Sequence, residues 1–149
     1  MLRYCGGNAL SDFRLEKLMR ELHACAIQVS QIDTEYWYFC AVSQTLTAAE
    51  TALLETVLNC CQPRQPADND AFYLVTPRPG TISPWCSKAT DIARHCGLSA
   101  VERIERGTAY YIRTDQAISP EQQRTLQMAL HDRMTETVFR TFEEAERLF

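Results

Sequence analysis

The second half of the chain repeats the first at an offset of 72 residues, and this repeat constrains the fold more than any other feature. Matched positions have identical or chemically similar residues in the strands, the helix starts and the helical faces, and the alignment needs no gap. The matched pairs are Leu2 with Leu74, His23 with His95, Ile32 with Ile104, Tyr38 with Tyr110, Leu54 with Leu126 and Leu58 with Leu130. The sequence therefore predicts two tandem halves with the same order of elements.

Each half has the apolar pattern strand, helix, strand, strand, helix. Residues 2–5 predict the first strand, and residues 27–42 predict either one bent strand or two paired ones, because β-branched and aromatic residues dominate them. Residues 101–114 predict a strand pair with Gly107 near its turn, and residues 71–77 predict a strand. Residues 74–76 could close half one or open half two, and the sequence leaves this open.

Helix starts carry capping residues in both halves. Ser11 is a predicted N-cap, and Thr47 with Glu50 and Ser119 with Gln122 have the spacing of capping boxes. Apolar residues then recur at helical spacing and predict the buried helical faces. These faces comprise Leu15, Leu18, Met19 and Leu22; Leu53, Leu54, Val57 and Leu58; and Leu126, Ala129 and Leu130.

The predicted fold class is α+β, with two tandem ferredoxin-like halves whose mostly antiparallel sheets carry helices on one face. Half one spans residues 1–62 and half two spans 71–140, joined by a polar, proline-bearing linker at 61–70. Half two adds a last strand at Glu136–Phe139. Residues 141–149, capped by Thr141 and Glu144, predict the start of a connecting helix, so we expect further protein to follow.

Composition excludes several classes of protein. The 149 residues carry a net charge of -4, which argues against a general nucleic-acid binder. There is neither an apolar run long enough for a membrane span nor a signal peptide, so we expect a cytoplasmic protein. The seven cysteines include no Cys-x-x-Cys pair and the three histidines lie far apart. We therefore expect no metal site, and reduced cysteines that fill the core.

The stretch TPRPGTISPWCSKATDIA, residues 76–93, predicts a rigid loop followed by a helix that Ser83 caps and Gly97 ends. One helical face is predicted to pack in the core, namely Trp85, Ala89, Ile92 and Cys96. The opposite face is polar and comprises Ser87, Lys88, Asp91 and His95. Between them runs a stripe of small residues that would let a second backbone approach closely, made of Cys86, Thr90, Ala93 and Gly97.

This stretch has three possible interpretations, namely a cysteine nucleophile, a phosphate site and a capped helix without chemistry. Cys86 has no histidine at i+3 or i+4, so packing is favoured over a nucleophile. A phosphate could bind the helix start through Thr81, Ser83, Ser87 and Lys88. We favour the simpler interpretation, in which the hydroxyls cap the helix and Lys88 pairs with a carboxylate at i+3, Asp91.

Two other polar or aromatic segments have simple explanations. Residues 131–139 predict a helix C-terminus where positive charge is favourable, from His131 and Arg133. The tyrosine-rich strands predict side chains packed on both faces of a sheet and not a base-stacking platform, given the acidic net charge.

The segments LRY, ALSDFRLEKL, TPRPGTISPWCSKATDIA, CGL, IERGTAYYI and HDRMTE resemble the N-terminal domain of the large single-chain phosphoribosylformylglycinamidine synthase, or formylglycinamide ribonucleotide amidotransferase. The resemblance covers essentially the whole chain. In that family the domain is similar to a dimer of a small accessory subunit, which agrees with the repeat. Cys86 stands where the family typically has serine.

The resemblance implies an enzyme of purine biosynthesis, an ATP-dependent glutamine amidotransferase ligase that makes formylglycinamidine ribonucleotide. This fragment would have no catalytic residue, cofactor or metal and would be inactive alone. ATP and magnesium would bind the synthase domain, and a glutaminase domain with its own catalytic residues would supply ammonia. Those two domains are the expected partners, and whether the isolated fragment self-associates stays open.

The fragment would act as a structural domain that docks on the synthase domain and helps to form its active site or ammonia path. The residues expected at the interface or supporting the active site are Arg78, Thr81, Ser83, Ser87, Lys88 and Asp91, with Trp85 and Cys86 as packing support. The alternative is a regulatory small-molecule binding module of tandem ferredoxin-like halves. A stand-alone cysteine hydrolase is a more remote alternative.

Overall fold

The structure is a computed structural model that describes residues 1–64 and 70–149, so half of the predicted linker lies outside the described residues. Strands and helices alternate along the chain. They are β1 (Leu2–Cys5), α1 (Asp12–Ala24), β2 (Val29–Val42), α2 (Ala48–Val57), β3 (Ala71–Pro77), α3 (Pro84–His95), β4 (Val101–Thr114), α4 (Pro120–Leu130), β5 (Glu136–Phe139) and the 3-10 helix η1 (Glu143–Leu148).

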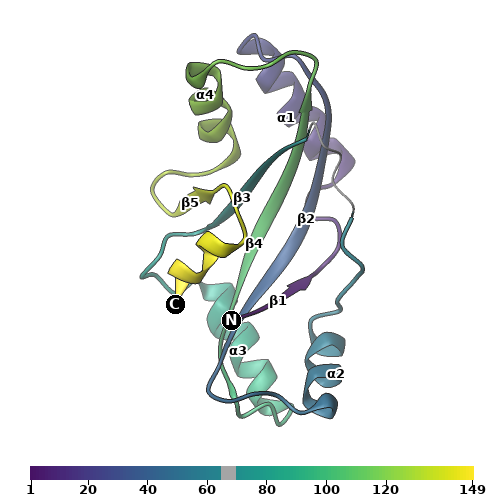
Figure 1. Cartoon of the computed structure of the whole chain (residues 1–149), viewed down its shortest axis with the longest axis vertical. Helices are drawn as coiled ribbons and strands as arrows, with labels where there is room; N and C mark the ends of the chain where they lie inside the picture. Colours follow the sequence, from purple (N-terminus) through teal and green to yellow (C-terminus); the bar gives the residue numbers. More distant parts are fainter. Residues whose placement is uncertain (65–69) are drawn as a thin grey trace.

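All five strands form one antiparallel sheet in the order β1-β2-β4-β3-β5, which confirms the α+β class and is consistent with ferredoxin-like halves. β2 and β4 are unbroken strands of 14 residues that run along the molecule (Figure 1). β3 pairs only with β4 and β5 among the described strands, so it opens half two.

The predicted turn near Gly107 is wrong, because β4 passes through this residue without a break. Gly107 has a different structural role. A Cβ atom there would lie 3.0 Å from Cγ2 of Thr76 and 3.1 Å from the carbonyl oxygen of Val75. Glycine therefore lets β3 approach β4 closely, and it does not reverse the chain.

The pairing of β2 with β4 is itself symmetric with respect to the repeat. Tyr36 pairs with Thr108, which is its own equivalent 72 residues later. The pair Ile32–Ile112 maps onto the pair Cys40–Ile104 under the same offset. The bounds of β2 and β4 also agree at this offset, as do the starts of α1 and α3 and those of α2 and α4, so the elements are consistent with the repeat.

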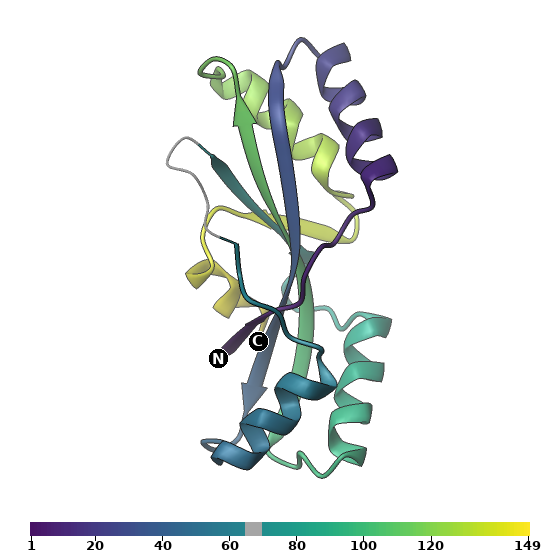
Figure 2. The same cartoon turned by 90° about the vertical axis from the view of Figure 1, so that its right-hand side faces the viewer.

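Helices from different halves gather at each end of the sheet. α1 and α4 lie at one end, whereas α2 and α3 lie at the other (Figures 1 and 2). In the first lobe, α1 contributes Leu18 and Leu22, which share a core with Leu126 of α4. In the second lobe, Leu54 of α2 shares a core with Ala93 of α3. Each lobe is thus built from both halves.

The sheet is apolar on both faces, as predicted for the aromatic strands. Tyr38 and Tyr110 belong to the cores under the helices. Phe39 and Tyr111 belong to a third core on the other face, to which η1 contributes Leu148. No helix among the described residues combines the length and the apolar character that crossing a membrane would require.

The predicted helix caps are confirmed. The side chains of Ser11, Thr47, Ser83 and Ser119 each accept a hydrogen bond from an amide of the first turn, and the two capping boxes are complete. The residues of the predicted apolar faces of α1, α2 and α4 are buried or half-buried, with two exceptions.

Leu53 is 38% exposed and Ala129 is also exposed, because the adjacent Leu54 and Leu130 face the sheet more directly. At the C-terminus, Thr141 accepts from the amide of Glu144, but the segment that follows is a 3-10 helix.

Candidate functional site

α3 lies close against β4 through its stripe of small residues. Cys86, Thr90 and Ala93 are the buried residues of this helix. The hydroxyl of Thr90 donates to the carbonyl of Cys86 at 2.8 Å and accepts from the backbone amide of Ile104 at 3.0 Å. The predicted close approach of a second backbone is therefore confirmed, and that backbone belongs to β4.

The predicted core face of α3 is only partly right, because Trp85 and Ala89 contact the core of the second lobe but Ile92 and Cys96 do not. Trp85 and Ala89 are only half-buried, Ile92 is 46% exposed and Cys96 is exposed. Small side chains let the helix axis come nearer to the sheet than large ones would, so the stripe packs in the core and the larger apolar residues turn sideways. They face the space between α3 and α2.

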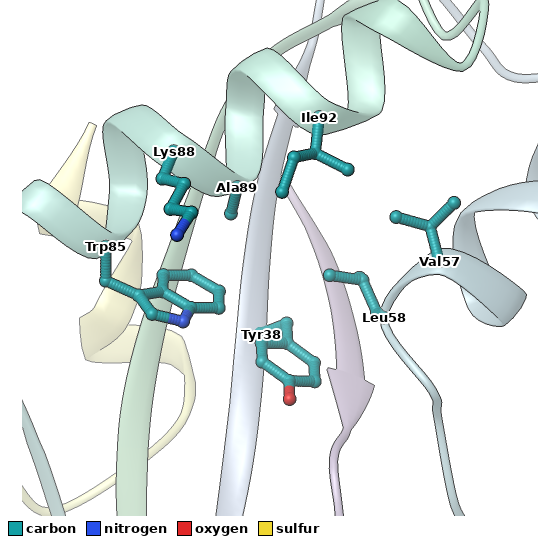
Figure 3. A pocket seen from close by; sticks show the side chains of 7 residues that line it. All are labelled: Tyr38, Val57, Leu58, Trp85, Lys88, Ala89 and Ile92. Carbon is teal, nitrogen blue, oxygen red and sulfur yellow. The ribbon is translucent and has the colours of Figure 1, made fainter.

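That space is a cleft of about 320 Å³ on the helix side of the sheet (Figure 3). Tyr38 comes from β2, and the other walls come from the end of α2 and from α3. The lining residues are Tyr38, Val57, Leu58, Trp85, Lys88, Ala89 and Ile92.

Stacking holds the aromatic side chains of the cleft in place. The rings of Tyr38 and Trp85 are nearly parallel, with centroids 5.6 Å apart. The guanidinium of Arg106 lies 4.7 Å from the centre of one Trp85 ring and 4.3 Å from that of Tyr36. Aromatic stacking and cation–π contact each contribute on the order of 0.5–1.5 kcal/mol, so this wall is ordered before any partner arrives.

Lys88 is the charged residue at the cleft. Of the described residues that line the space, it alone carries a charge. Figure 3 shows its amine on the same side of α3 as the indole of Trp85. The predicted pairing with Asp91 is wrong, because the ion pairs among the described residues do not include it. The ammonium group is exposed to solvent and available for a partner.

The loop before α3 uses its hydroxyl groups internally. Thr81 donates its hydroxyl hydrogen to the carbonyl of Arg78 at 2.6 Å. Ser83 accepts from the amide of Cys86 at 2.9 Å and donates to the carboxylate of Glu105 at 2.8 Å. Glu105 is 1% exposed, so the chain supplies its own buried anion beside the N-terminus of α3. The capping interpretation is therefore favoured over the phosphate cradle.

Arg103 ties this loop to the rest of the domain. It donates to the carbonyl of Thr81 at 2.6 Å and to that of Leu148 at 2.8 Å, and it forms an ion pair with Glu105 at 3.2 Å. The loop, β4 and η1 thus share one hydrogen-bonded junction. Sequence reasoning missed Arg103 and Glu105, although their i, i+2 spacing in a strand places both on one face of the sheet.

Cys86 has the environment of a packing residue. It is 1% exposed, and burial raises the pKa of its thiol, although a hydrogen bond from Arg103 acts in the opposite direction. A thiol that resists ionisation is a poor nucleophile. The structure therefore supports the assignment of Cys86 as a packing residue. Trp85 forms part of the wall of the neighbouring cleft.

The remaining predicted residues are exposed to solvent in the loop and on α3. Arg78 and Thr81 lie in the loop, whereas Ser87, Lys88 and Asp91 lie along the outer side of α3, and all five are exposed. The described residues contain no cluster of histidine, cysteine and carboxylate side chains that could hold a metal ion.

A family model described as formylglycinamide ribonucleotide amidotransferase N-terminal matches residues 35–149. The match runs from the middle of β2 to the end of the chain, so it includes the loop, α3 and the cleft. It covers well over half of the sequence. The chain therefore belongs to the family of formylglycinamide ribonucleotide amidotransferase N-terminal domains.

Proposed function

We propose that the chain is the accessory domain of phosphoribosylformylglycinamidine synthase and that it docks on the synthase region through the loop before α3 and the outer side of α3. The family assignment supports the enzyme, and the exposed polar surface supports the place of docking. The observation that carries the proposal is Lys88, a cation without an ion-pair partner among the described residues, on a helix that is fixed to the sheet through its small-residue stripe.

The docking surface is rigid because contacts with β4 hold both α3 and the loop in place. The small-residue stripe fixes α3 on β4, and the junction of Arg103 and Glu105 fixes the loop. A preorganised surface loses little conformational entropy on binding, so more of the contact energy appears as affinity. This is the property expected of a structural element that completes an active site without performing chemistry.

The reaction itself would take place in other regions of the enzyme. ATP, magnesium and formylglycinamide ribonucleotide would bind the synthase region, and ammonia released from glutamine would reach it from a glutaminase region. The surface of this domain would close one side of the synthase site or of the ammonia path. Its side chains would orient and seal that site and would not form bonds with substrate.

The test is Lys88→Ala in the full enzyme, assayed with glutamine and with ammonia as nitrogen donors. We expect kcat/KM to fall by about tenfold, the equivalent of roughly 1.4 kcal/mol of lost interaction. A loss with both donors would place Lys88 at the synthase site, and a loss with glutamine alone would place it at the ammonia path.

Lys17→Ala is the matched control, since Lys17 is exposed on α1 in the other lobe. Unchanged kinetics of Lys88→Ala with both donors would refute the proposed role of this surface in the synthase active site or the ammonia path.

A further inference from the structure

We propose that the cleft between α2 and α3 receives one apolar side chain, flanked by a carboxylate, from the synthase region of the enzyme. This inference rests on the proposed function, and it names the chemistry of the partner segment.

The two lobes are equivalent by sequence, yet only one of them is closed. In the first lobe, Leu18 and Leu22 of α1 join the core that contains α4. Their equivalents in α3 are Thr90, whose hydroxyl bonds to the backbone, and Arg94, which is exposed. α3 therefore presents no leucine toward α2, and the flank of the second lobe stays open as the cleft.

The helices that form the cleft carry two exposed apolar residues, and the helices of the first lobe carry two at other positions, Phe13 and Met128. Ile92 of α3 is 46% exposed and Leu53 of α2 is 38% exposed. At the equivalent positions of the closed lobe stand Arg20 and Thr125. The apolar surface of the second lobe thus continues outward from the cleft, which is the arrangement of a protein-binding surface with a central pocket.

The size of the cleft favours a side chain over a metabolite. About 320 Å³ lies at the lower limit of small-molecule pockets, which span roughly 300–1,000 Å³. Those pockets also gather several convergent polar groups, whereas this one offers mainly the walls of Trp85, Leu58 and Ile92. One large apolar side chain, with its backbone lying across the exposed rim, would fill it.

The rim determines the charge of the partner. Lys88 is the charged lining residue, and covering it would remove water from its ammonium group. Removing a cation from water is unfavourable unless an anion replaces the lost hydration. A carboxylate next to the apolar anchor supplies that anion and also orients the segment.

The test is photo-cross-linking in the full enzyme, with the photoreactive residue p-benzoylphenylalanine replacing Ile92. We expect a product in the synthase region, at a segment that holds an apolar residue beside Asp or Glu. Lys88→Glu in the same protein should reduce its yield at least fivefold. The matched control carries the probe at Met128, which is 57% exposed on α4, and should give no product at that segment.

Three results would overturn the inference. They are a product with a second copy of the chain, a product with a retained small molecule, and the absence of any Ile92-specific product. Each of them leaves the proposed function intact if Lys88→Ala still lowers kcat/KM. Conversely, an Ile92 product in the synthase region with unchanged Lys88→Ala kinetics would support docking in the cleft and refute a role in the active site.

Discussion

Replacing Arg103 with methionine would remove the counter-charge of Glu105 and three hydrogen bonds from the junction behind the loop, to Cys86, Leu148 and Thr81. Glu105 is 1% exposed and Arg103 is 19% exposed at the side chain. Breaking a buried ion pair by deleting one partner typically costs about 3–5 kcal/mol, because the other charge is left uncompensated. Since water reaches part of Arg103, we expect a loss of about 3 kcal/mol in the free energy of unfolding, at the lower end of that range.

The measurement is urea unfolding of the 149-residue chain, followed by tryptophan fluorescence. At this size about 1 kcal/mol corresponds to roughly 2–4 °C, so the melting temperature should fall by about 6–12 °C. The double variant R103M/E105Q should recover about 2 kcal/mol, because a glutamine oxygen can still accept from Ser83 and from the amide of Arg106 without carrying a buried charge.

A loss below about 1 kcal/mol for R103M would refute the reasoning, since it would mean that Glu105 is compensated by other groups. A double variant no more stable than R103M would refute it as well, because the cost would then lie in the lost hydrogen bonds to Thr81 and Leu148 and not in the unpaired charge.

Two further perturbations test the packing around the cleft. Under native conditions iodoacetamide should alkylate exposed Cys96 at least tenfold faster than Cys86, because burial raises the pKa of the Cys86 thiol, and equal rates would contradict its buried placement. Gly6→Ala would put a Cβ atom 2.5 Å from the ring of Tyr38, so we expect the free energy of unfolding to fall by about 1–3 kcal/mol. The near-UV circular dichroism signal from the Tyr38–Trp85 stack should also change. An unchanged signal would show that the ring is not constrained.

The repeat predicted the elements well because capping and periodicity are local properties. It could not predict which helices share a lobe, since that depends on the pairing of β2 with β4 over a long sequence separation. Gly107 shows the limit clearly. A glycine between two apolar segments favours a turn on local grounds, whereas here its missing side chain admits β3.

The packing of α3 differs from the packing predicted from the sequence. Apolarity alone ranks Trp85 and Ile92 above Cys86 and Thr90 as core residues. The structure reverses the order because the helix can approach β4 only through small side chains. Arg103 was missed because alternating charges in a strand usually mark a solvated face, and only the loop and η1 folded over that face turn it into a junction.

Because each lobe combines helices from both halves of the sequence, neither lobe is complete early in synthesis of the chain. Leu18 and Leu22 emerge from the ribosome about 100 residues before Leu126, with which they share a core. At roughly 5–20 residues per second, α1 waits on the order of 5–20 s with its leucines uncovered. Half one is therefore exposed to chaperones or to misassociation during this interval, and neither lobe can be completed until the second half of the domain has been made.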